Sequence, residues 1–181
     1  MSSVLGYLPL ERNLCNGYYP NNMIDVKYAS LTFFQGLSKE DLRFILPFFT
    51  SASYVGGSTI FEQGENADYL YLVVSGEIII RYKPADGPTM TVTRVQPGGV
   101  FGWSAAMGNT TYTSGAVCSL NSEVLSIPGQ SLRTVCRQNP TIGNILLDRL
   151  SLVIAERKSK RQGQVSAILN DNIYHTNARG G

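Results

Sequence analysis

Residues 60–78 read IFEQGENADYLYLVVSGEI, a run in which short apolar segments alternate with turn residues. The segment from Tyr69 to Val74 is rich in aromatic and β-branched residues, which favour strands. Ser75 and Gly76 interrupt it before the next apolar segment. Glycine adopts positive φ without steric cost, so Gly64 and Gly76 are predicted to lie at tight turns. The stretch therefore predicts two short strands separated by a turn.

The same pattern continues on both sides, from Ser51 to Pro128. The predicted strands are Tyr54-Val55, Thr59 to Phe61, Tyr69 to Val74, Glu77 to Tyr82, Thr89 to Val95, Thr111 to Cys118 and Glu123 to Ile127. Glycine, proline and asparagine separate them. Many short strands at regular spacing are typical of a roll, sandwich or barrel.

Helical periodicity flanks this β region. Ser38 begins a segment that resembles a capping box, with acidic residues in the first turn and Leu42, Ile45 and Phe49 at helical spacing. Pro47 is expected to bend or end this N-terminal helix. After Pro128, two C-terminal helices are predicted, over Gln130 to Arg137 and from Thr141 to about Lys160. The fold class is therefore mainly β with flanking α.

The second C-terminal helix carries an apolar stripe too broad for one neighbour. We expect it to pack on the β region and also to contact another chain, either as a homodimer or with a partner. The predicted interface residues are Ile142, Ile145, Leu146, Leu150, Val153 and Ile154.

Composition narrows the class of protein. The chain has 181 residues, of which 43% are hydrophobic, and this favours one core with extensions. A net charge of +2 does not indicate nucleic acid binding. The three cysteines are far apart and predict neither disulfides nor zinc, so a reducing, cytoplasmic setting is expected. No secretion signal or membrane-spanning segment is recognised.

The chain divides into three parts. Residues 1–30 lack a clean period and are predicted to form an irregular N-terminal arm, whose tyrosines lie on the domain or on a partner. Residues 31–161 form the predicted domain, and residues 162–181 form a polar C-terminal tail with a few apolar residues. Both arms are expected to embrace another subunit.

The order of elements resembles that of cyclic-nucleotide-binding domains, as found in catabolite-activator-type regulators and protein kinase A regulatory subunits. Residues 60–71 look like the family's I-F-x-x-G-E-x-A-D-x-L-Y, and residues 74–78 look like its V-x-S-G-E-V. Residues 97–102, PGGVFG, resemble the P-G-D-x-F-G that leads into its phosphate-binding cassette. The resemblance covers about residues 30–155 and implies a jelly-roll-like β-roll.

The cassette departs from the family's pattern. Ligand-binding members follow Phe-Gly with a Glu for the ribose hydroxyl and, about ten residues later, an Arg for the cyclic phosphate. Here Trp103 stands at the Glu position, and Tyr112 or Thr113 at the Arg position. Hydrogen bonds to charged groups contribute about 1.5–3 kcal/mol each, so losing both weakens a nucleotide by roughly a hundred- to ten-thousandfold. Ordinary cAMP or cGMP binding is therefore not expected.

A site for another small anion stays open as an alternative. A short helix starting near Trp103 would present free N–H groups, and nearby hydroxyls would assist them, although such hydroxyls also cap and pack. Arg81 and Arg94 lie on predicted strands and would bring charge from another direction. The candidate ligand-binding residues are Gly102, Trp103, Ser104, Thr111, Thr113, Ser114, Arg81 and Arg94.

Catalysis has little support in the sequence. The only histidine is His175 in the tail, and no nucleotide-binding or metalloprotease motif occurs, so no catalytic or metal site is predicted. Two hypotheses remain: a regulatory or assembly subunit with a degenerate cassette, or a sensor of a nucleotide or small anion that signals through its C-terminal helix. Direct DNA reading is not expected, because about twenty residues after Arg161 are too few for a helix-turn-helix module.

Overall fold

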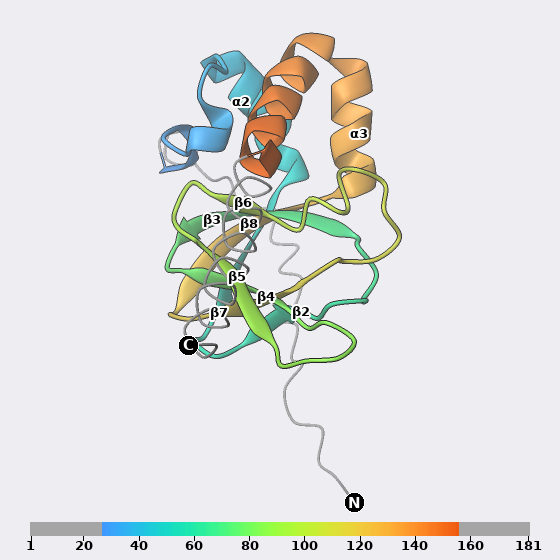
Figure 1. The fold of residues 1–181 in the computed structure, drawn as a ribbon. Coiled ribbons are helices and arrows are strands. Elements are labelled where there is room, and N and C mark those ends of the chain that lie inside the picture. The colour runs from blue at the N-terminus through green and yellow to red at the C-terminus, as the bar shows by residue number, and fades with distance from the viewer. Residues whose placement is uncertain (1–26, 156–181) are drawn as a thin grey trace, which may run out of the picture.

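The computed structural model describes residues 27–155, which form two antiparallel sheets with helices gathered at one end (Figure 1). The first sheet has the order β1-β8-β3-β6 and the second has the order β2-β7-β4-β5. This arrangement confirms the predicted β-roll with flanking helices. The predicted arm up to residue 26 and the tail 162–181 lie outside the described residues.

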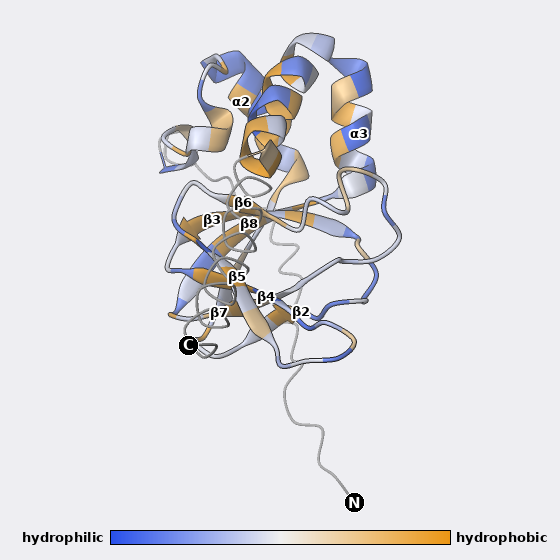
Figure 2. Cartoon of the chain, in the orientation of Figure 1, coloured by the Kyte–Doolittle hydropathy of each residue, from blue (hydrophilic) through white to orange (hydrophobic). Residues whose placement is uncertain are grey.

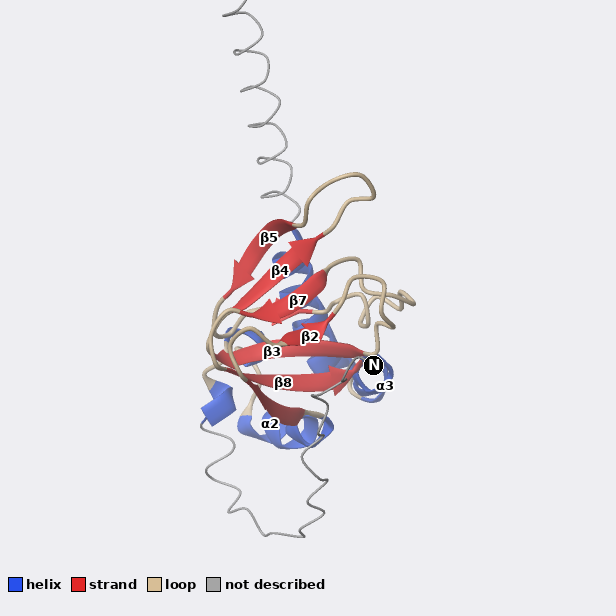
Figure 3. Ribbon diagram, turned by 90° about the horizontal axis from the view of Figure 1, so that it is seen from below, coloured by secondary structure: helices blue, strands red, loops and turns tan. Residues whose placement is uncertain are grey.

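The first sheet is built around its two longest strands, β3 and β8, which pair from Tyr69↔Pro128 to Val73↔Val124. Its strands are β1 (Thr50–Tyr54), β8 (Ser122–Pro128), β3 (Tyr69–Ser75) and β6 (Val100–Phe101). The second sheet consists of β2 (Thr59–Phe61), β7 (Gly115–Cys118), β4 (Ile78–Tyr82) and β5 (Met90–Val95). Figure 3 shows β2, β7, β4 and β5 side by side.

The glycine turns expected from the sequence are present. Gly64, Gly76 and Gly98 have φ of +90°, +84° and +83°. At Gly76 a side chain is excluded on a second ground, since a Cβ there would lie 2.2 Å from Ser122 Oγ. These turns fix the short connections that the roll needs.

The N-terminal helix α2 (Lys39–Ile45) has the predicted capping box. Asp41 N–H donates to Ser38 Oγ at 3.1 Å, and Ser38 N–H donates to an Asp41 carboxylate oxygen at 2.9 Å. Pro47 lies in the short 3-10 helix η2 (Leu46–Phe48), which ends the segment. A further 3-10 helix, η1 (Thr32–Phe34), precedes α2 and buries two phenylalanines.

Two helices follow the roll. The first is α3 (Gly129–Gln138), and the second runs from residue 140 to the end of the described region at residue 155. They cross closely, because a Cβ at Gly143 would lie 2.8 Å from the Cα of Cys136. Within residues 27–155, none of the helices has the length and apolar character needed to cross a membrane.

The core has two parts, on opposite faces of the first sheet. One lies between the two sheets and includes Ile78, Phe101 and Val124. The other lies between the first sheet and the helices and includes Leu70, Ile127 and Ile142. Figure 2 shows hydrophobic colour along the strands, whereas the helices carry both hydrophobic and hydrophilic residues.

This second core corrects part of the predicted interface. Ile142, Leu146 and Leu150 are 0%, 1% and 4% exposed, because they pack on the domain itself, so they are core residues rather than interface residues. Ile145, Val153 and Ile154 keep partial exposure. The most exposed apolar side chains of this helix are instead Leu147 and Leu152.

Candidate functional site

The cassette begins where β6 ends. Gly102 has φ of +71°, and a Cβ at this position would lie 2.8 Å from the Tyr69 carbonyl oxygen. Residues 103–108 then form hydrogen-bonded turns, in which Met107 N–H donates to the Trp103 carbonyl at 3.0 Å. The short helix predicted from Trp103 is therefore absent from the described structure. The predicted anion binding by a helix N-terminus has no structural basis here.

The cassette holds a small, partly open pocket with a volume of about 30 Å³. This is close to the volume of one water molecule, whereas ligand pockets typically hold about 300–1,000 Å³. The described lining residues are Phe61, Ile80, Gly102, Trp103, Ser104, Tyr112, Thr113 and Ser114. None of these eight is charged. The pocket is therefore small and its described lining carries no charged side chain.

Tyr112 is one of the bulky side chains that line the pocket. Its ring stacks on Phe61, with centroids 3.7 Å apart and planes inclined by 16°. Its hydroxyl donates to the Tyr69 carbonyl oxygen at 2.8 Å and accepts from the Tyr69 N–H at 3.0 Å. The side chain is 4% exposed, and burial raises the pKa of its phenol. Tyr112 is thus held at both its ring and its hydroxyl.

The stacked pair belongs to a larger aromatic cluster that also contains Tyr71 and Phe101. The rings of Tyr71 and Phe101 stack with centroids 5.0 Å apart, and Phe61 lies 5.6 Å from Tyr71. Offset stacking of this kind stabilises a core beyond its buried area. The cluster fills the inner side of the cassette with protein side chains. Phe61 was not predicted to line the cavity. Tyr112 was predicted to stand at or next to the family's Arg position, and this did indicate that it lies at the cassette.

Trp103 contacts two regions of the fold. It lines the small cavity but packs against the core cluster beneath the helices. The turn that follows it is tied to α3, since Arg133 Nη1 donates to the Ala105 carbonyl oxygen at 2.7 Å. A Cβ at Gly129 would lie 2.3 Å from the same oxygen. The cassette turn and α3 are therefore in direct contact.

The structure brings together five of the eight predicted ligand residues. Gly102, Trp103, Ser104, Thr113 and Ser114 line the cavity. The other three lie elsewhere. Thr111 is exposed, and instead of beginning a strand it makes an isolated bridge with Asn66. Arg81 and Arg94 do not reach the cavity, because their side chains project from the other face of the second sheet.

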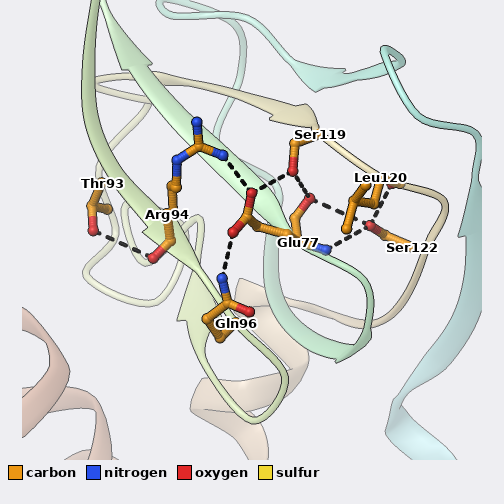
Figure 4. A network of polar contacts seen from close by, with 7 residues as sticks. All are labelled: Glu77, Thr93, Arg94, Gln96, Ser119, Leu120 and Ser122. Atoms are coloured by element: carbon orange, nitrogen blue, oxygen red, sulfur yellow. Dashed lines mark hydrogen bonds and ion pairs between the residues drawn. The ribbon is translucent and has the colours of Figure 1, made fainter.

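Arg94 belongs to a polar cluster around Glu77, at the turn that leads into β4 (Figure 4). Arg94 Nη1 donates to Glu77 Oε1 at 2.5 Å, Ser119 Oγ donates to the same oxygen at 2.6 Å, and the Gln96 amide donates to Oε2. The hydrogen bond from Ser119, followed by that from Arg94, lowers the pKa of the Glu77 carboxyl. The charge of Arg94 is therefore used within the fold.

Chemistry other than binding has little support among the described residues. Residues 27–155 contain no cluster of potential metal ligands. Burial raises the pKa of the Cys118 and Cys136 thiols, which makes both poor nucleophiles at neutral pH.

Known proteins resemble this chain in both sequence and structure. Residues 52–139 match the family model described as the cyclic nucleotide-binding domain. The chain is 27% identical over 123 residues to the cyclic AMP receptor protein of Thermus thermophilus, covering 68% of this chain and 57% of the relative. It is 26% identical over 150 residues to the CRP-like cAMP-activated global transcriptional regulator of Mycobacterium tuberculosis, covering 83% of this chain and 65% of the relative.

A solved cyclic nucleotide-binding domain from Methylobacillus flagellatus superposes with a TM-score of 0.69. The match covers 78% of this chain and 80% of that domain at 18% identity, so it supports the fold alone. The chain spans less than two thirds of the length of the two curated relatives.

Proposed function

We propose that the chain is a non-catalytic regulatory or assembly subunit with a degenerate cassette, since residues 52–139 match the family model of the cyclic nucleotide-binding domain. It acts through contacts with protein, either a second copy or a partner, and binds cAMP and cGMP weakly or not at all. One relative is named a cyclic AMP receptor protein and another a cAMP-activated global transcriptional regulator, which supports regulation as the general role.

The observation that carries this proposal is the position of Tyr112. The family's pattern places an Arg here to meet the cyclic phosphate, and this chain places a phenol whose ring is stacked and whose hydroxyl is bonded to Tyr69. A nucleotide would have to displace that ring, lose the two hydrogen bonds and still find no cation. Each of these costs opposes binding.

Isothermal titration calorimetry with cAMP and cGMP tests the proposal. We expect dissociation constants no tighter than high micromolar for the wild-type chain. The double variant Trp103→Glu/Tyr112→Arg restores the charged residue types at both family positions and is expected to bind cAMP at least about tenfold more tightly, the effect of one charged hydrogen bond. Tyr112→Phe serves as the control, because it retains the ring and adds no charge. Submicromolar binding by the wild-type chain would overturn the proposal.

A sensor of another small anion remains the second candidate, supported by the hydroxyl residues Ser104, Thr113 and Ser114 around the cavity. It requires Tyr112 to leave its place, since about 30 Å³ admits no such ligand. Tyr112→Ala therefore separates the two candidates. Under the sensor hypothesis it opens the site and strengthens binding in an anion screen, whereas an assembly subunit gains no specific ligand.

Association is proposed to use the exposed side of the helix 140–155 and the two arms, residues 1–30 and 162–181. We further propose that the chain works in the cytoplasm and does not read DNA directly. Fluorescence anisotropy with duplex DNA at physiological salt tests the last point. Specific, sequence-dependent binding by this chain alone would contradict it.

A further inference from the structure

A second concave site lies on the outer face of the second sheet, away from the cassette. Its volume is about 550 Å³, which is within the range of small-molecule pockets. Strands β4 and β7 form its floor, and the loop from β4 to β5 forms one wall. Figure 3 shows β4 and β7 side by side, with this loop extending beyond them. Strand β4 also contributes Ile80 to the cassette on the opposite face, where Thr113 and Ser114, which directly precede β7, line the pocket as well.

Two cations line this concavity. Arg81 projects from β4, and Lys83 follows two residues later. Neither has an ion-pair partner within residues 27–155, where Arg94 and Lys27 are paired with Glu77 and Glu123. The two charges are therefore available to an external anion. An arginine guanidinium suits a phosphoryl group in particular, because it donates two parallel hydrogen bonds.

The site is held in shape by hydrogen bonds that are independent of any ligand. Lys83 N–H donates to Gln63 Oε1 at 2.8 Å, and the Gln63 amide donates to the Lys83 carbonyl at 3.1 Å. This pair of bonds fixes the backbone of Lys83 against the end of β2. The start of the Lys83 side chain is therefore held beside the concavity.

Gly115 leaves the floor of the concavity open. It is the register partner of Arg81, and a Cβ there would lie 3.3 Å from Glu62 Oε2 and 3.4 Å from Gln63 N. The Glu62 carboxylate therefore lies over this floor. It accepts hydrogen bonds but repels a second anion, so a ligand has to present hydrogen-bond donors, such as hydroxyl groups, on this side.

From this arrangement we propose that the outer concavity binds a phosphorylated polyol, such as a sugar phosphate. Arg81 and Lys83 hold the phosphoryl group, the Thr89 hydroxyl lies on the same wall, and Glu62 accepts from the ligand's hydroxyls. The site is separate from the cassette and does not depend on the proposed function.

Two-dimensional ¹H–¹⁵N NMR of the full chain tests this proposal, with ribose 5-phosphate and inorganic phosphate as probes and chloride as the ionic-strength control. We expect saturable shifts at the amides of Arg81, Lys83, Thr89 and Gly115, with tighter binding of the ester than of phosphate. Arg81→Gln should weaken ester binding by about tenfold or more. Glu62→Gln should reduce the preference for the ester over phosphate.

Arg137→Gln is the matched control, since it removes an exposed arginine on α3 whose described contact is with Thr134. It should leave the affinity unchanged. Shifts spread evenly over exposed lysines and arginines, or an unchanged affinity in Arg81→Gln, would overturn the proposal, as would equal binding of ester and phosphate. Cassette binding is monitored separately through the Trp103 indole, so failure of this site and failure of the proposed function give different spectra.

Discussion

At the scale of single residues, Tyr112 accounts for most of what distinguishes this cassette. One side chain occupies space, removes the position of a cation and closes the edge of β3 through the Tyr69 backbone. Under the proposed function, each of these three effects opposes the binding of a cyclic nucleotide. A site that is occupied by its own side chains is also a stable part of the core.

Replacing Tyr112 should therefore reduce stability in two separable steps. Tyr112→Phe removes only the bonds to Tyr69, and we expect a loss of about 0.5–1.5 kcal/mol in the free energy of unfolding. Tyr112→Ala also leaves a cavity beside Phe61, and we expect a loss of about 3–5 kcal/mol, as for other buried aromatic residues. Urea denaturation measures both values. Equal, small losses in the two variants would show that the stacked ring contributes little.

The carboxylate of Glu77 gives a pH-dependent contribution of predictable sign. Its pKa is lowered in the folded state by Ser119 and Arg94, so it stabilises the fold above the ordinary glutamate pKa of about 4.3 and loses this effect as the pH falls through the folded value. Glu77→Gln should lower the melting temperature at pH 7, and the difference from the wild type should shrink as the pH falls below about 4.3. Differential scanning calorimetry from pH 7 to pH 3 measures this. A difference that is constant with pH would mean that the charge of Glu77 is irrelevant.

At the scale of elements, the sequence predicts long, regular segments better than short ones. Helix α2 begins at its predicted cap because Ser38 and Asp41 satisfy each other's backbone groups locally. The strands at Thr59 and Tyr69 begin as predicted, since turn residues mark both. Strand β6 has two residues and was not predicted, and Thr111 was wrongly assigned to a strand. Both errors lie next to the cassette, where the pairing of β6 with Tyr71 and Leu72 and the bridge from Thr111 to Asn66 decide the backbone.

The crossing of α3 with the helix 140–155 depends on the absence of a side chain at Gly143. A Cβ there would lie 2.8 Å from Cys136 Cα and 3.0 Å from its carbonyl oxygen. Alanine favours helices over glycine by about 1 kcal/mol, but overpacking costs about 1–3 kcal/mol, so we expect Gly143→Ala to destabilise the domain. Asn144→Ala is the control, because Asn144 is exposed on the same helix. This variant should make the domain slightly more stable, since alanine favours helices. Chemical denaturation compares the two, and a more stable Gly143→Ala would show that the crossing has room to adjust.

At the scale of the whole molecule, the domain core buries some of the apolar residues of the helix 140–155 and leaves others exposed. The broad stripe on the helix 140–155 was predicted correctly as a stripe, but its period could not show how much of it the roll itself would cover. Ile142, Leu146 and Leu150 complete the domain's core. The side of this helix that the domain leaves exposed is narrower than the predicted stripe. The small size of the cassette pocket was likewise not predictable from the sequence pattern. It depends on the stacking of Phe61 and Tyr112, which are far apart in sequence.

The remaining surface predicts how the chain associates with a second copy. Ile145 and Leu152 are seven residues apart and therefore share one side of the helix, where Leu152 is 57% exposed. We expect the wild-type chain to form dimers at high micromolar concentration, and we expect Leu152→Asp to weaken self-association at least about tenfold by placing a charge in the interface. Ser151→Asp is the matched control, because it adds the same charge at an exposed neighbour on another side of the helix. Sedimentation velocity measures all three, and thermal melting confirms that each variant is folded. A monomeric wild-type chain, or equal effects of the two aspartates, would show that this side of the helix is not the interface and would shift the proposed assembly to the arms.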